Sequence, residues 1–198
     1  TVVKGIFEAQ KNNKNIFLYP LRKSKIKYDI DHPNILISKS NKKYTFKPLK
    51  ELRDIIKRHK IGILHCHLLR SQVFGYILKR FYFPKIKLIF HEQGQDSDNT
   101  FFHKRFMGSG KNKVNIFLAV SKFIKNNLVK KSRIPENKIK VLYNFVDLNK
   151  FNRKNITWDI QKEREKIGIK KDEFVIGFAG RLIKRKGWRE FIEAAKLL

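Results

Sequence analysis

Two predicted strands end in histidines, a residue type that binds metal ions and transfers protons. His65 and His67 stand at alternate positions near the end of an apolar run, residues 61–67. Alternation puts both side chains on one face of a strand, where they can ligate a metal or line a ligand crevice. Because His91 and His103 fall in separate predicted loops, we favour a crevice or a sheet cap and expect no metal site.

The segment His91-Glu92-Gln93-Gly94 follows a second apolar run, residues 86–90, at its expected carboxyl end. In an open α/β sheet, ligands bind at that edge. His91 and Glu92 are therefore candidates for acid–base groups, although solvated loop residues would give the same pattern. Two strands that end in histidine at the same edge favour the functional interpretation.

A third candidate site is a cationic glycine turn near the C-terminal end of the sequence. An apolar run, residues 174–178, is predicted to form a buried strand that breaks at Ala179 and Gly180. Arg181, Lys184, Arg185 and Lys186 follow directly, and then Gly187 precedes a helical pattern. Such a strand–turn–helix unit is suited to a phosphate-bearing ligand. An ordinary turn with solvated lysines fits the pattern equally well.

Alternating short apolar runs and helical patterns position these candidates. Strands are predicted at residues 16–19, 35–37, 61–67, 86–90, 114–120, 139–143 and 174–178. Helices are predicted within residues 1–13, after Pro48, at 71–83, at 121–131 with Ser121 as N-cap, and after Gly187, whereas the region of Gly108 and Gly110 is predicted to be a polar loop. This alternation indicates an α/β fold with a Rossmann-like, doubly wound parallel sheet.

Domain boundaries follow from the composition. We expect one Rossmann-like domain at residues 1–147, a polar connection with one short helix at 148–172, and the first strand and helix of a second such domain at 173–198. The sequence begins at Thr1, and Leu198 lies within a helical pattern. We therefore expect a piece of a longer protein.

The chain is strongly basic, with 46 Lys and Arg against 17 Asp and Glu and a formal charge of +29. This charge attracts anions such as nucleic acid, an acidic membrane face or phosphorylated small molecules, although a coding bias toward lysine explains part of it. No nucleic-acid-binding motif is present, so that alternative rests on charge alone. The predicted helix at 121–131 either rests on an anionic membrane or packs on a core with a solvated basic face.

Compartment signals are few. Cys66 is the single cysteine, so no intrachain disulfide framework exists and a reducing compartment is the default. No apolar stretch approaches the roughly 20 residues that span a bilayer.

Five motifs, in order, resemble glycosyltransferase family 4, whose members have the two-domain GT-B fold. They are Ile63-Leu-His-Cys-His67, Phe90-His-Glu-Gln-Gly94, Ala119-Val-Ser121, the stretch 138–147 with Phe151, and Gly177-Phe-Ala-Gly-Arg-Leu182 with Lys186-Gly187. The resemblance covers nearly the whole chain. It implies that residues 1–147 form the acceptor-side domain and residues 173–198 begin the donor domain.

On the donor side, the resemblance implies that Gly180, Arg181 and Lys186 contact the diphosphate of a nucleotide-sugar. Fixed cations there stabilise the charge that grows on the leaving nucleoside diphosphate. No divalent metal or other cofactor is then implied, because the nucleotide-sugar is a substrate, and the family generally retains anomeric configuration. Glu190 and Glu193 lack the spacing of the family's donor-binding glutamates, so we expect this chain alone to be inactive.

On the acceptor side, the resemblance implies that His67, Glu92, Gln93 and Gly94 line the cleft. Gln93 stands where the family usually has histidine before the glycine, so His91 is the candidate for the catalytic role. Phe145 replaces the usual glycine of the interdomain motif.

The expected function is transfer of a hexose from a nucleotide-sugar to a surface polysaccharide, a lipopolysaccharide or a lipid-linked glycan. The resemblance implies a cytoplasmic protein, with peripheral contact to the anionic inner face of the cell membrane as a further expectation. The alternatives are a basic nucleic-acid-binding protein, which is the less favoured partner class, and a non-catalytic glycosyltransferase relative.

Overall fold

The computed structural model describes residues 2–22, 32–42, 45–94, 101–149, 151–155 and 157–197. Within them the chain divides into two compact units, Thr1–Phe145 and Val146–Leu198. The predicted assignment of these regions to an acceptor domain, a linker and a donor domain stays a prediction.

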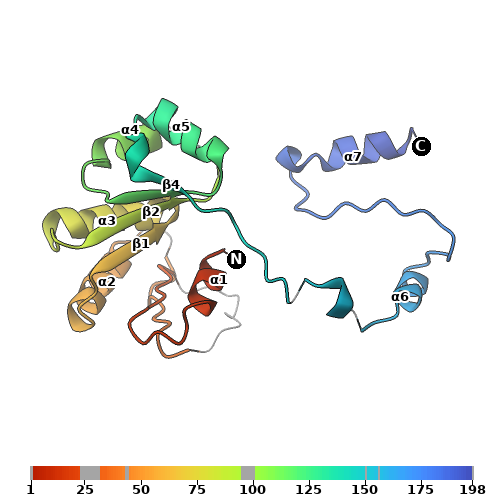
Figure 1. Cartoon of the computed structure of the whole chain (residues 1–198), viewed down its shortest axis with the longest axis horizontal. Coiled ribbons are helices and arrows are strands. Elements are labelled where there is room, and N and C mark those ends of the chain that lie inside the picture. Colours follow the sequence, from red (N-terminus) through yellow and green to blue (C-terminus); the bar gives the residue numbers. More distant parts are fainter. Residues whose placement is uncertain are drawn as a thin grey trace. The chain divides into compact units, whose positions relative to one another are not determined.

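A four-stranded parallel sheet forms the centre of the first unit (Figure 1). Its strands are β1 (Ile63–His67), β2 (Lys87–Glu92), β3 (Ile116–Ala119) and β4 (Ile139–Val141), hydrogen-bonded in the order β1-β2-β3-β4. All three pairings are parallel, so each strand returns through a crossover. This arrangement confirms the predicted α/β fold with a Rossmann-like parallel sheet.

Helices occupy the crossovers and flank the sheet. The first unit contains α1 (Val2–Glu8), α2 (Lys47–Arg58), α3 (Leu68–Phe81), α4 (Phe101–Gly110), α5 (Lys122–Ser132) and the 3₁₀ turn η1 (Glu136–Lys138). Helix α3 packs on β1 and β2, α5 packs on β3 and β4, and α4 packs on α5. Ser121 caps α5 as predicted, since its hydroxyl accepts a hydrogen bond from the Ile124 amide at 3.2 Å. No helix in the described ranges has the length and apolarity needed to cross a membrane.

The core lies between the sheet and these helices. Leu88, Phe90 and Phe117 have no exposed surface, and the rings of Phe90 and Phe117 meet edge to face with centroids 5.8 Å apart. Central parallel strands are covered on both faces, which fits the unbroken apolar run Leu88-Ile89-Phe90 in the middle of β2. Because this apolar run is buried, the polar residues His91 and Glu92 that follow it lie at the carboxyl end of β2.

The predicted loop around Gly108 and Gly110 is wrong, because this region forms helix α4. Both glycines lie near other elements of the fold. A Cβ on Gly108 would lie 3.4 Å from the Ser132 carbonyl oxygen, and one on Gly110 would lie 3.5 Å from the Tyr76 ring. Met107, directly before Gly108, is 1% exposed. Tertiary contact therefore overrides the low helix propensity of glycine.

The predicted strands at 16–19 and 35–37 are reduced to a single parallel bridge, Leu18↔Ile35. The Asn34 side chain donates hydrogen bonds to the carbonyls of Lys14 and Ile16 at 3.1 and 3.0 Å. A side-chain amide thus takes acceptors that a neighbouring strand would otherwise use.

The second unit contains the 3₁₀ turn η2 (Arg153–Asn155), α6 (Ile160–Lys166), the 3₁₀ turn η3 (Lys184–Lys186) and α7 (Trp188–Ala195). The predicted strand at residues 174–178 is wrong: the segment is not assigned to a strand, and no described residue pairs with it in a ladder. A strand requires hydrogen bonds to a neighbour. Phe174 is accordingly 90% exposed, although its apolar sequence suits a buried strand.

Close packing of α3 on the sheet gives a test of the fold. A Cβ on Gly75 would lie 2.6 Å from Cys66 Sγ and 2.9 Å from Leu88 Cδ1. Gly75→Ala should therefore lower the free energy of unfolding by about 1–2 kcal/mol, because overpacking strain exceeds the gain in helix propensity. Urea denaturation measures the change.

Gly62→Ala is the matched control, since nothing lies within 4 Å of a Cβ at that position. Equal stability of the Gly75→Ala variant and the wild type would contradict the packing described.

Candidate functional site

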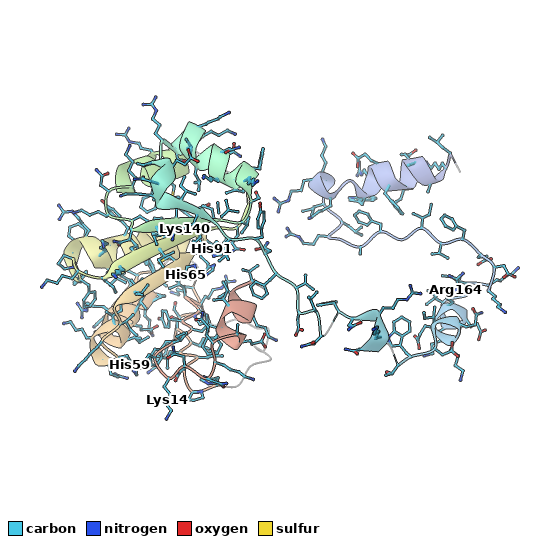
Figure 2. All side chains as sticks on the ribbon, in the orientation of Figure 1. Lys14, His59, His65, His91, Lys140 and Arg164 are labelled. Atoms are coloured by element: carbon cyan, nitrogen blue, oxygen red, sulfur yellow. The ribbon has the colours of Figure 1, made fainter. Side chains whose placement is uncertain are left out.

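Three histidines meet at the carboxyl ends of β1 and β2. The strands pair in a register that sets His67 opposite His91 and His65 opposite Ile89. Alternation puts His65 and His67 on one face of β1, and their ring centroids lie 4.3 Å apart. The His91 ring lies 5.2 Å from that of His65 and 4.8 Å from that of His67, and Figure 2 labels His65 and His91 on these strands. We call His65, His67 and His91 the histidine cluster.

One hydrogen bond joins two rings of the histidine cluster, and another joins the third ring to Gln93. His65 Nε2 and His91 Nδ1 lie 3.2 Å apart, so one ring donates an N–H to the other. The Gln93 side-chain amide lies 3.3 Å from His67 Nδ1. His91 is 1% exposed, and its Nε2 is buried without a hydrogen-bond partner among the described residues. A buried polar atom in this state calls for a ligand or a water.

Burial keeps the cluster uncharged. Burial, with smaller effects of the adjacent His65 and His91, lowers the pKa of His67 to about 3. Burial, with a smaller effect of His65, lowers the pKa of His91 to about 4, and burial also lowers the pKa of His65. At neutral pH each ring therefore offers one N–H donor and one nitrogen lone pair. The cluster is equipped to bind a hydroxyl group or a metal ion.

The prediction that His91 lies in a separate loop was wrong. Strand β2 extends through His91 and Glu92, because both continue the parallel ladder with β3. The available signal was the matched position of His67 and His91 at the ends of two parallel runs. His65, which the family resemblance did not place in the acceptor cleft, belongs to the cluster as well.

Glu92 lies away from the histidine cluster. Successive residues of a strand face opposite sides of the sheet, and Glu92 follows His91. Its Oε1 accepts a hydrogen bond of 2.7 Å from Gln72 Nε2 on α3. Glu92 thus anchors α3 to β2 in the structure, and its predicted role in the cleft stays a prediction.

Of the other predicted cleft residues, the structure brings Gln93 to the cluster through its contact with His67. Gly94 is exposed and has open space where a Cβ would stand. Cys66 points to the α3 side of the sheet, close to Gly75. Burial raises the pKa of its thiol to about 12, so Cys66 is a core residue and no nucleophile.

The predicted diphosphate-binding residues form a tight cationic turn in the second unit. Gly180 lies at a bend, and Arg181 and Lys186 are exposed. The amide of Ile183 bonds to the Arg181 carbonyl at 2.8 Å, and the Lys186 amide bonds to the Ile183 carbonyl at 2.9 Å. Gly187 then adopts φ +69°, a left-handed conformation that favours glycine. These bonds hold the cations immediately before the first turn of α7.

The described residues contain one group of side chains suited to a metal ion. The histidine cluster places one ligand atom from each residue within 4.8 Å of the others. From the sequence we expected no metal site, because His91 was assigned to a loop away from His65 and His67.

This chain is similar to known proteins in sequence and in structure. The family model described as Glycosyltransferase Family 4 matches residues 16–150, more than half of the chain. A crystal structure of a glycosyltransferase from Rickettsia africae ESF-5 is similar, with a TM-score of 0.66, 25% identity and coverage of 85% of this chain and 44% of that one. Anabaena Alr3699/HepE, solved in complex with UDP-glucose, has a TM-score of 0.59, 18% identity and coverage of 75% and 40%. The chain thus spans less than half the length of both. No curated protein matches.

The neutral histidines predict a pH dependence of stability. The unfolded chain protonates these rings below about pH 6.5, whereas in the folded chain the pKa values of His67 and His91 are about 3 and 4. Stability is therefore fully present above pH 6.5 and is lost as the pH falls through this range. Between pH 7.5 and 5, the double variant His67→Gln/His91→Gln should lose about 1–2 kcal/mol less free energy of unfolding than the wild type, after allowance for solvent screening.

Urea denaturation at both pH values measures the difference. His59→Gln is the control because it removes an exposed histidine outside the cluster, and it should lose as much as the wild type. An equal loss in the double variant would refute the assignment of a buried, neutral cluster.

Proposed function

The chain belongs to glycosyltransferase family 4, and we propose that its complete protein transfers a hexose from a nucleotide-sugar to an acceptor hydroxyl. The observation that carries this proposal is the family match over residues 16–150, which includes the sheet and its histidine cluster. The neighbour solved with UDP-glucose supports a nucleoside-diphosphate sugar as the donor.

The cationic turn is the proposed binding site for the donor diphosphate. Gly180 allows the backbone to approach the phosphates, and Arg181 and Lys186 supply two positive charges on a turn that hydrogen bonds constrain. Glycosyl transfer expels a nucleoside diphosphate, whose negative charge grows in the transition state. Preorganised cations stabilise that charge, so the reaction needs no divalent metal at the diphosphate. We propose a retaining, metal-independent transfer.

The histidine cluster is the proposed acceptor side. Because its lowered pKa keeps His91 neutral, the ring interacts with a hydroxyl through a hydrogen bond and carries no charge. Gln93 orients His67 through their contact. His91 takes the role of the histidine that the family usually has at the position of Gln93.

The charge of the chain supports an anionic acceptor environment. We propose a surface polysaccharide, a lipopolysaccharide or a lipid-linked glycan as the acceptor, and a cytoplasmic location with peripheral contact to an anionic membrane. A formal charge of +29 favours such contact. Helix α5 carries Lys122, Lys130 and Lys131 together with Phe123, which is 62% exposed.

Substitution of the cationic turn tests the function. In the complete enzyme, Arg181→Ala and Lys186→Ala should each lower kcat by about 100-fold, because each removes one donor to the leaving diphosphate. Release of nucleoside diphosphate in the presence of acceptor measures turnover. Lys171→Ala is the matched control, since it removes an exposed cation of the same unit outside the turn, and near-normal turnover of both turn variants would sink the assignment.

The 198-residue chain by itself should transfer no sugar. It spans less than half the length of its structural neighbours, and residues 174–178, which should open the donor domain, lack strand partners among the described residues. The same diphosphate-release assay checks this expectation. Measurable sugar transfer by the isolated chain would contradict it.

A further inference from the structure

We propose that the histidine cluster is a binding site for a divalent transition-metal ion, foremost Zn²⁺, at the carboxyl edge of β1 and β2. The motif of His65 and His67 supplies two imidazoles from one strand, and the parallel register adds His91 from the next. No role assigned above requires a metal at this place. The proposal concerns the acceptor-side unit alone and is independent of the donor chemistry.

The separation of the ring nitrogens suits tetrahedral zinc. With Zn–N distances of about 2.0–2.1 Å, two ligand atoms of a tetrahedral site lie about 3.3–3.4 Å apart. His65 Nε2 and His91 Nδ1 are 3.2 Å apart. The third ligand atom, from His67, lies within 4.8 Å of the others. Coordination by all three rings therefore requires the half-buried His67 ring to turn toward the other two.

The protonation state of the cluster also suits a metal. Imidazole binds metals only when neutral, and protonation competes with the ion. His91 is 1% exposed, and burial favours the neutral form of an imidazole. The proton between His65 and His91 moves to another nitrogen of the same neutral ring. The buried Nε2 of His91, which has no partner in the described part of the chain, is one nitrogen able to carry it.

The type of ligand selects the metal. Three imidazoles without an oxygen or sulfur ligand suit Zn²⁺, Ni²⁺ or Cu²⁺, whereas Mg²⁺, Ca²⁺ and Mn²⁺ prefer oxygen. Glu92 and Cys66 lie on the opposite face, toward α3, and contribute no ligand. Three protein ligands leave the fourth position open for water or another small ligand.

Gln93 occupies the position of an outer-sphere partner. Its side-chain amide lies 3.3 Å from His67 Nδ1. Metal-bound histidines usually hydrogen-bond through their second ring nitrogen, and that contact fixes the tautomer and the orientation of the ring. Gln93 thus positions His67 for coordination.

Direct metal binding tests the proposal without any activity assay. Isothermal titration of the metal-free chain with ZnCl₂ should show one ion per chain, and titration with MgCl₂ should show none. His67→Gln and His91→Gln should each weaken Zn²⁺ binding by about 100-fold, because each removes a ligand. His59→Gln, which removes an exposed histidine elsewhere, should bind Zn²⁺ as the wild type does.

Circular dichroism of each metal-free variant establishes that it is folded. If His91→Gln fails to fold, His65→Gln takes its place, because His65 is less buried. Loss of Zn²⁺ binding in a folded cluster variant, with binding retained in His59→Gln, supports the site. Absence of Zn²⁺ binding by the wild type, or equal binding by all variants, overturns it.

Discussion

The parallel pairing of β1 with β2 is the interaction on which the site depends. A ladder with this register sets His67 beside His91, and the alternation of β1 adds His65 on the same face. A slip of one residue would turn the three imidazoles away from one another. The register is fixed by burial, because Leu88 and Phe90 of β2 have no exposed surface and a slip would expose them.

The two faces of β1 and β2 carry different residues: one packs against α3, and the other carries the histidine cluster. On one face, Gly75 lets α3 approach Cys66 and Leu88 closely, and Glu92 ties the helix to β2 through Gln72. On the other face, the strands hold three imidazoles with one nitrogen of each within 4.8 Å of the others and partly out of water. Lowered pKa values follow from that burial, so the core determines the protonation state of the site.

In the second unit, the cationic turn forms although the apolar segment before it pairs with no strand among the described residues. The turn from Arg181 to Gly187 keeps its own hydrogen bonds, and the left-handed Gly187 starts α7. These features need only neighbouring residues. The segment 174–178, in contrast, forms no ladder with any residue that the structure describes. Local geometry therefore presents the cations, whereas a packed sheet is needed to bury the apolar residues before them.

The sequence alone determined the α/β class, the four sheet strands, the cap at Ser121 and the family, because these depend on periodicity, turn chemistry and motif order along the chain. Tertiary structure decided the rest. Gly108 and Gly110 are helical in α4, which packs on α5, and local propensity does not contain such tertiary packing. The histidine cluster likewise arises from strand register: His65 and His91 are 26 positions apart in sequence, and only the parallel ladder brings their rings together.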